Sequence, residues 1–175
     1  MLIVVCGLPG TGKSTVADAV GETLGVPVFS VDPIEAAIWR AGVPASHETG
    51  VAAYEVAATL AAHQLALGLT AIVDAVSEIE IARNMWREAA RRTGTQMRVI
   101  EVVCTDEDLH RRRLEGRRRD IEGFYEPTWE SVQERRKEYE QWQDERLVLD
   151  STEDRRDNLD RALDYLQTGV TAPRT

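Results

Sequence analysis

The sequence lacks the features that identify membrane, secreted and nucleic-acid-binding proteins. No apolar run approaches the length needed to span a bilayer, and the apolar segment Leu2–Cys6 is not preceded by the basic stretch of a targeting signal. The only cysteines, Cys6 and Cys104, fall in apolar runs where a thiol packs as a small hydrophobe, so we expect neither a disulfide nor a metal site. A formal charge of −9 disfavours attraction to nucleic acid and anionic membranes. These absences predict a cytoplasmic protein that binds small molecules and binds neither nucleic acid nor membranes.

Lysine is scarce as well, since only Lys13 and Lys137 stand beside 19 arginines. Repeats, low-complexity tracts and linkers are also missing. A chain of 175 residues with 43% apolar content can bury one sizeable core. We therefore expect a single domain over residues 1–168, followed by a flexible tail over residues 169–175.

One of the two lysines completes a phosphate-binding motif. Residues 7–14 read Gly-Leu-Pro-Gly-Thr-Gly-Lys-Ser, which matches G-x-x-x-x-G-K-[ST] and follows an apolar run typical of a buried strand. Gly7 and Gly12 allow a tight turn that points backbone N–H groups at an anion, and the helix that follows adds the positive end of its dipole. Lys13 would reach the β- and γ-phosphates, and Ser14 would bind Mg²⁺. The motif predicts a nucleoside triphosphate held by Gly7, Pro9, Gly10, Thr11, Gly12, Lys13, Ser14 and Thr15.

Apolar, β-rich runs alternate with helical patterns along the chain. This alternation predicts an α/β fold in which helices cover both faces of a parallel sheet. We expect helices to end at the glycines at positions 25, 68 and 94, and to begin at Asp106, Thr128 and Thr152. The expected strands are residues 2–6, 26–31, 70–74, 97–104 and 146–149, and the expected helices are residues 13–24, 34–40, 49–67, 79–92, 106–119, 128–142 and 152–167.

Two aspartates at the ends of predicted strands are candidates for the ligand-binding edge of the sheet, where the carboxyl ends of parallel strands meet. Asp74 could hold a Mg²⁺-bound water or orient a substrate, and the alternative is that it caps the helix that follows. Asp32 ends the apolar run Val28–Val31 and precedes Pro33, which stops the strand. Asp32 could accept the proton of an attacking hydroxyl, cap the next helix, or do both.

An arginine-rich stretch lies between residues 106 and 139. Arg113 and Arg117 are four apart, so on a helix they project from one face, where planar guanidinium groups could stack on a base and clamp a phosphate. Arg135 follows a loop that contains Gly123 and Pro127. For the other arginines, a solvated helix face with intrahelical ion pairs is the favoured interpretation. These are Arg111, Arg112, Arg118, Arg119 and Arg136.

Together these motifs resemble those of the P-loop small-molecule kinases, a group that includes AAA-type, chloramphenicol-phosphotransferase-like and zeta-toxin-like kinases as well as nucleotide, shikimate and gluconate kinases. Residues 113–117, Arg-Leu-Glu-Gly-Arg, resemble the R-x-x-G-R that opens the lid of nucleotide kinases, whose first arginine stacks on adenine and whose second contacts the triphosphate. Residues 132–139 are similar to the returning lid helix, whose arginine at the position of Arg135 reaches the transferred phosphate. Residues 29–35 resemble the segment of antibiotic-phosphorylating and polynucleotide kinases in which the aspartate, here Asp32, is the base.

The resemblance implies a three-layer P-loop NTPase fold with a five-stranded parallel sheet of order 2-3-1-4-5 and a helical lid at about residues 113–135. It implies ATP and Mg²⁺ as cofactors. It also implies that Asp32, Lys13, Arg117 and Arg135 are catalytic, that Arg113 and Arg117 bind the nucleotide, and that the metal is bound by Ser14 and, through water, Asp74.

The acceptor pocket is expected in the segment between the second and third strands. Small side chains there leave room for a ligand, and an aromatic ring could form a flat wall of the pocket. The tryptophan of this segment could instead belong to the core. The candidate substrate-binding residues are Asp32, Glu35, Trp39, Arg40, Tyr54 and Asp74.

The expected function is transfer of the ATP γ-phosphate to a hydroxyl group of a small molecule, either a metabolite or an antibiotic-like compound. Glu35 occupies the position where nucleic-acid 5′-hydroxyl kinases carry an arginine, which disfavours a polynucleotide acceptor. Neither Asn84 nor Asn158 precedes a lysine, so the N-K-x-D element of guanine-specific GTPases is missing. One alternative is a nucleoside or nucleoside-monophosphate kinase, for which only Arg40 could meet an acceptor phosphate. Another is a non-catalytic ATP-binding regulatory module.

Overall fold

A computed structural model describes residues 1–117, 121–122 and 125–169. The tail predicted beyond residue 169 and part of the predicted lid lie outside these residues. The strands are β1 (Leu2–Cys6), β2 (Val28–Ser30), β3 (Ala71–Asp74), β4 (Met97–Val103) and β5 (Arg146–Asp150). The helices are α1 (Lys13–Leu24), α2 (Val31–Arg40), α3 (His47–Ala66), α4 (Glu80–Arg92), α5 (Glu107–Gly116), α6 (Trp129–Glu138) and α7 (Arg155–Thr168).

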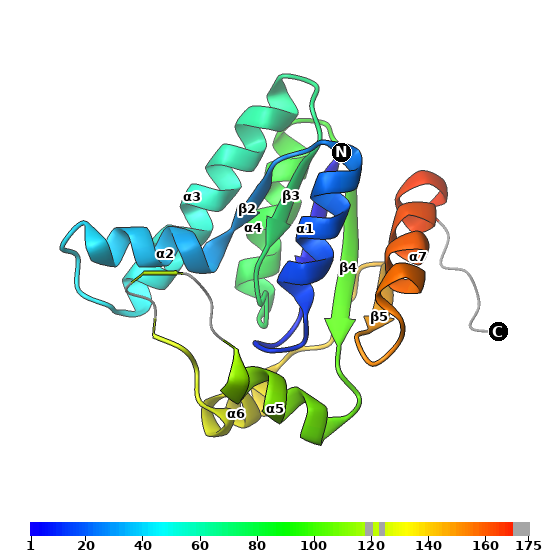
Figure 1. Cartoon of the computed structure of the whole chain (residues 1–175). Coiled ribbons are helices and arrows are strands. Elements are labelled where there is room, and N and C mark those ends of the chain that lie inside the picture. Colours follow the sequence, from blue (N-terminus) through cyan, green and yellow to red (C-terminus); the bar gives the residue numbers. More distant parts are fainter. Residues whose placement is uncertain (118–120, 123–124, 170–175) are drawn as a thin grey trace.

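The five strands form one parallel sheet in the order β2-β3-β1-β4-β5, which confirms the predicted fold class and strand order. Asp74 pairs in register with Val5 on one side and with Ser30 on the other. The carboxyl ends of β1, β2 and β3 therefore meet beside the loop that follows β1. Figure 1 shows α5 and α6 together beyond the carboxyl end of β4.

Helices cover both faces of the sheet and bury a separate apolar cluster on each face. The strands are apolar because parallel strands between two helical layers have no solvent-facing side. On one face, α1 and α7 contribute Ala17, Val20, Ala162, Tyr165 and Leu166. On the other face, α3 and α4 contribute Ala53, Ala57, Ala61, Leu65, Trp86, Ala89 and Ala90. The three-layer architecture agrees with the sequence prediction.

The start of α2 corrects the placement of Asp32. The strand was expected to run to Val31, but β2 ends at Ser30, and Val31, Asp32 and Pro33 already form the first turn of α2. Pro33 is compatible with a first turn, because the N–H groups there have no intrahelical partner. The capping alternative for Asp32 is also wrong, because Ser30 occupies the N-cap position. Asp32 instead lies at the positive end of the α2 dipole.

The remaining element ends agree with the predictions within a few residues. Gly25 ends α1 in the left-handed conformation, and Asp106 and Thr128 cap α5 and α6 through their side chains. Thr152 was expected to begin α7, but Asp154 caps that helix and the Thr152 N–H donates to Asp150. In the described part of the chain, no helix is long and apolar enough to cross a membrane.

Candidate active site

The loop between β1 and α1 has the backbone conformation that its motif requires. Gly7, Gly10 and Gly12 have φ values of 142°, 87° and 96°, a region that side chains disfavour. A Cβ atom on Gly7 would lie 2.2 Å from the carbonyl oxygen of Val102 on β4. Gly12 is the N-cap of α1, so the loop delivers its backbone to the positive end of that helix.

Lys13 and Asp74 form a buried pair at the head of this loop. The side chains are 4% and 5% exposed, and Lys13 Nζ lies 4.0 Å from Asp74 Oδ1. Ser30 Oγ donates to Asp74 Oδ2 at 3.0 Å, whereas Oδ1 accepts no hydrogen bond from the described residues. Because Ile79 is the N-cap of α4 and no side chain caps this helix, the capping alternative for Asp74 is wrong. The carboxylate instead links the phosphate loop to β2 and keeps one oxygen available.

A cavity of about 440 Å³ opens in front of the loop. It brings together the predicted Gly10, Gly12, Lys13, Ser14 and Thr15, and adds residues that sequence reasoning missed. The added residues come from α1, from the loop between β5 and α7, and from α7 itself. They are Val16, Ala19, Ser151, Glu153, Arg155, Asn158 and Leu159. For the five residues after β5, the available signal was their position after the last predicted strand, since that places them at the same edge of the sheet as the loop.

Arg113 and Arg117, the first two arginines of the predicted lid, also line this cavity. Arg113 donates from Nη1 to Ser151 Oγ at 2.8 Å and from Nη2 to the Ser151 carbonyl at 3.1 Å. Arg117 Nη2 lies 2.6 Å from Glu126 Oε2. Arg113 therefore joins α5 to the β5–α7 segment, and both guanidinium groups border the space in front of the phosphate loop.

A second group of charged residues lies around α2. Burial, followed by the charge of Asp32, raises the pKa of Glu35, and Arg135 opposes this shift. Burial and then the charges of Glu78 and Asp32 raise the pKa of Tyr54, which Arg135 again opposes. Arg135 Nη1 lies 3.8 Å from Glu78 Oε2. Five side chains from α2, α3, α6 and the β3–α4 loop thus share one electrostatic environment.

The aromatic and basic candidates of the acceptor segment are held by local contacts. Trp39 Nε1 donates to Thr49 Oγ1 at 3.0 Å, and its ring centroid lies 5.5 Å from that of Tyr125. Arg40 Nη1 donates to the Glu122 carbonyl at 2.6 Å. The Tyr54 hydroxyl accepts from the Ser77 N–H at 3.1 Å, and its ring stacks on the buried Trp86. Trp39 is half-buried, whereas Arg40 is exposed and reaches the segment after α5.

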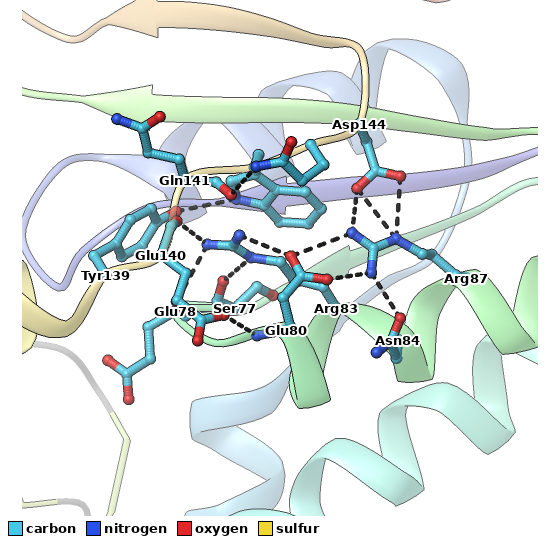
Figure 2. Close-up of polar contacts among 12 residues, drawn as sticks. Ser77, Glu78, Glu80, Arg83, Asn84, Arg87, Tyr139, Glu140, Gln141 and Asp144 are labelled. Atoms are coloured by element: carbon cyan, nitrogen blue, oxygen red, sulfur yellow. Dashed lines mark hydrogen bonds and ion pairs between the residues drawn. The ribbon is translucent and has the colours of Figure 1, made fainter.

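Arg83 of α4 is fully buried and forms hydrogen bonds with the β3–α4 loop and with the segment that follows α6 (Figure 2). Its Nε donates to the Ser77 carbonyl at 2.9 Å, and its Nη2 donates to the carbonyls of Glu78, at 3.2 Å, and Glu140. The guanidinium carbon lies 4.4 Å from the centroid of Trp142. Arg83 thereby fastens the β3–α4 loop, which carries Glu78, to the chain that leaves α6.

Replacing Arg83 with methionine is expected to lower the free energy of unfolding by about 3 kcal/mol, because it removes the donors to the Ser77 and Glu140 carbonyls and leaves the Glu78 carbonyl with the Glu140 N–H alone. Urea unfolding followed by circular dichroism measures this change. Arg91→Met is the matched control, since Arg91 lies on the same helix and is 74% exposed. Equal stability of the two variants would contradict the assigned role of Arg83.

Two side-chain oxygens near Lys13, one lining the cavity and one buried beside it, fit a magnesium ion carried by nucleotide phosphates. Mg²⁺ takes oxygen ligands and keeps several waters, so one or two protein oxygens suffice. Ser14 lines the cavity, and the buried Asp74 Oδ1 makes no hydrogen bond within the described residues. Among those residues, no group of three His, Cys, Asp or Glu side chains could hold a metal by itself.

Comparisons with known proteins connect this geometry to a family. A family model described as "AAA domain" matches residues 2–141. The chain is similar to a sugar kinase from Janibacter sp. HTCC2649, with a TM-score of 0.73, 19% identity and coverage of 99% and 98% of the two chains. It is similar to the APS kinase of Mycobacterium tuberculosis in complex with AMPPNP and APS, with a TM-score of 0.69, 19% identity and coverage of 95% of this chain and 97% of the other. It is also similar to Chaetomium thermophilum Kti12 in complex with ADP-AlF3, with a TM-score of 0.73, 21% identity and coverage of 99% of this chain and 100% of the other. These likenesses show a shared fold.

Proposed function

The chain belongs to the AAA domain family, and from this premise we propose that it is an ATP-dependent phosphotransferase that moves the γ-phosphate to a hydroxyl group of a small molecule. The observation that carries the proposal is the buried Lys13–Asp74 pair at the head of the phosphate loop. A buried carboxylate oxygen without a hydrogen bond is costly unless a ligand engages it. Two similar structures, one in complex with AMPPNP and APS and one in complex with ADP-AlF3, support a nucleotide as the donor.

On the donor side, the chain supplies preorganised positive charge. The backbone N–H groups of the loop and the Lys13 ammonium neutralise charge that develops on the transferred phosphoryl group. Mg²⁺ would supply charge neutralisation between the β- and γ-phosphates, held by Ser14 and, through water, by Asp74. Arg113 and Arg117 border the cavity and contribute donors from the lid side. The cavity walls formed by α1, α7 and the loop between β5 and α7 leave space for the base of the nucleotide.

On the acceptor side, Asp32 orients the hydroxyl group and takes its proton. Phosphoryl transfer depends mainly on positioning and electrostatics, so this base does not require a strongly raised pKa. Glu35 and Glu78 keep the surroundings of Asp32 acidic, and Arg135 from α6 balances part of that charge. Trp39 and Tyr54 provide aromatic surface beside this group.

The contacts of Arg40 favour this proposal over a nucleoside-monophosphate kinase. Arg40 is the only basic residue other than histidine between β2 and β3, and its guanidinium binds the Glu122 carbonyl. An acceptor phosphate in this segment would need at least one cation, and preferably a bidentate one. A hydroxyl compound without a phosphate therefore fits the described residues better.

The lid arginines are expected to act on turnover more than on ATP affinity. Each of Arg117→Ala and Arg135→Ala should lower kcat by about tenfold or more, since one charge-assisted hydrogen bond in the transition state is worth about 1.5–3 kcal/mol. The dissociation constant for Mg·ATP should change less, because a closing lid contributes most at the transition state. Calorimetry and steady-state kinetics measure the two quantities separately, with Arg111→Ala on the exposed face of α5 as control. Equal losses in affinity and turnover would contradict a lid role.

An acceptor screen tests the proposed function. Hydroxyl metabolites, sugars, nucleosides, aminoglycosides and phenicols are each added to the protein with Mg·ATP, and ADP release is followed. One class should raise ADP release well above the rate in water and gain the mass of one phosphate. Tight ATP binding without transfer to any compound or to water would indicate the regulatory module instead.

A further inference from the structure

His110 of α5 is a buried histidine that no part of the proposed mechanism uses. Its side chain is 1% exposed and lies directly behind the phosphate loop. Its Nε2 is 2.8 Å from the Pro9 carbonyl oxygen, and its Nδ1 is 3.1 Å from Arg136 Nη2. A Cβ atom on Gly10 would lie 3.1 Å from the His110 ring, so the ring packs against the loop where a side chain would not fit.

The partners of the two ring nitrogens determine the protonation state of the ring. The Pro9 carbonyl can only accept, so Nε2 must carry a hydrogen and donate it. The Arg136 guanidinium can only donate, so Nδ1 must offer its lone pair. Only the neutral Nε2–H form of His110 satisfies both contacts.

The same ring also anchors α6. Trp129, the first residue of α6, meets the His110 ring edge to face with the centroids 5.2 Å apart. The Arg136 guanidinium carbon lies 5.7 Å from the centroid of Trp129, and its Nη1 lies 3.6 Å from Glu107 Oε1. Gln133 Nε2 donates to the same Glu107 oxygen at 2.7 Å. Contacts from three positions of α6 thus converge on His110 and Glu107 of α5.

We infer that His110 is a positioning residue that holds α6, and with it Arg135, in register with the phosphate loop. Arg135 is the neighbour of Arg136 in the chain, so the bond from Arg136 to His110 fixes the helix that carries it. At the other ring nitrogen, the bond to Pro9 stabilises the loop in its anion-binding conformation. The inference rests on the proposed function for its catalytic consequence, but the coupling of loop and helix is measurable without catalysis.

The geometry predicts that acid breaks this coupling. Burial lowers the pKa of His110, the charges of Arg136 and Arg113 lower it further, and the Pro9 contact and Glu107 oppose these effects. Because the folded-state pKa lies below the unfolded value of about 6.5, the contribution of His110 to stability is complete above that pH. It is lost as the pH falls through the folded-state pKa, when the imidazolium would face the Arg136 donor.

Two substitutions separate the two bonds. His110→Gln retains a donor near the Nε2 position for Pro9, and His110→Asn retains an acceptor near the Nδ1 position for Arg136. His63→Gln is the control, since His63 lies exposed on α3. We expect amide hydrogen exchange in residues 129–138 to be at least about tenfold faster in His110→Gln, which loses the acceptor for Arg136, and close to the wild type in His110→Asn and in the control. The pH dependence of this exchange below about 6.5 should disappear in both variants.

The catalytic consequence is measured with Mg·ATP and water as the probe reaction. His110→Gln should release ADP about tenfold more slowly, with Mg·ADP affinity changed by less than about threefold, because the contact with the loop remains while α6 moves. Combining His110→Gln with Arg136→Met should add little to either single change, since both remove one contact. The inference would be overturned by unchanged exchange of α6 in His110→Gln. Fully additive effects of His110→Gln and Arg136→Met would overturn it as well. A wild-type protein that neither binds Mg·ADP nor releases ADP would contradict the proposed function, while the exchange experiment would still decide the role of His110.

Discussion

Replacing Lys13 with alanine is expected to abolish measurable phosphoryl transfer and to weaken ATP binding. The side chain enters the phosphate cavity and is 4% exposed, so no solvent cation can take its place at the transferred group. Loss of one preorganised charge or donor of this kind typically costs about 10²- to 10³-fold in turnover. The fold should persist, because the Lys13 ammonium lies beside Asp74 at the cavity and Lys13 belongs to neither apolar cluster of the core.

Lys137 provides the matched control for this experiment, since it is the other lysine of the chain and lies exposed on α6. Lys137→Ala should leave turnover and ATP affinity close to those of the wild type. Circular dichroism of both variants checks that the fold is retained. Wild-type turnover in the Lys13 variant would contradict the kinase proposal, because no other described lysine approaches the loop.

Replacing Asp32 with asparagine is expected to lower turnover by about 10²-fold or more, the usual contribution of a general base. ATP affinity should hardly change, because Asp32 lies in the first turn of α2 and does not line the cavity in front of the phosphate loop. Asparagine keeps the shape and can occupy the same first turn, so the change isolates the carboxylate. Transfer kinetics and Mg·ATP calorimetry on the same preparation give both numbers.

Asp160→Asn on the exposed face of α7 is the control for Asp32, and it should behave as the wild type. A combined loss of ATP affinity and turnover in Asp32→Asn would place Asp32 on the metal instead of the acceptor. Unchanged turnover would remove Asp32 from the mechanism altogether. The two outcomes can be told apart, because only the first changes the calorimetric titration.

The phosphate loop and the sheet could be predicted from the sequence because their determinants are local. A fixed spacing of Gly7, Gly12 and Lys13 defines the loop, and continuous apolar runs define strands that are buried on both faces. The position of Asp74 followed from the same logic, since parallel strands end at one edge. The order of the strands came from the family resemblance and agrees with the structure.

The start of α2 was less predictable, because Pro33 ends a strand and begins a helix equally well. The sequence before it, Val-Phe-Ser-Val, continues the β pattern, and only Ser30 as an N-cap marks the change. A similar ambiguity applies to α7, where Thr152 and Asp154 are both possible caps and the structure has Asp154 as the N-cap. Boundaries of this kind depend on which cap the surrounding structure favours.

The residues that sequence reasoning missed act through distant partners. His110 lies 101 positions from Pro9, and Arg83 lies 57 positions from Glu140, so no spacing rule connects either pair. Both residues belong to strongly charged segments whose usual interpretation is a solvated helix face. They are buried because α4, α5 and α6 pack against other segments of the fold, and no local pattern in the sequence records that packing.

A single-turnover experiment with γ-phosphate-labelled ATP tests the central claim most directly. The protein is held in excess over labelled Mg·ATP and mixed with the acceptor class identified by the screen, and the label is then divided between ATP, inorganic phosphate and acceptor. The account predicts that the label moves to a hydroxyl group of the acceptor in the wild type, and that it remains in ATP in Lys13→Ala and largely in ATP in Asp32→Asn. Label that remains in wild-type-bound ATP, or that appears only as inorganic phosphate, would contradict phosphoryl transfer to a small-molecule hydroxyl.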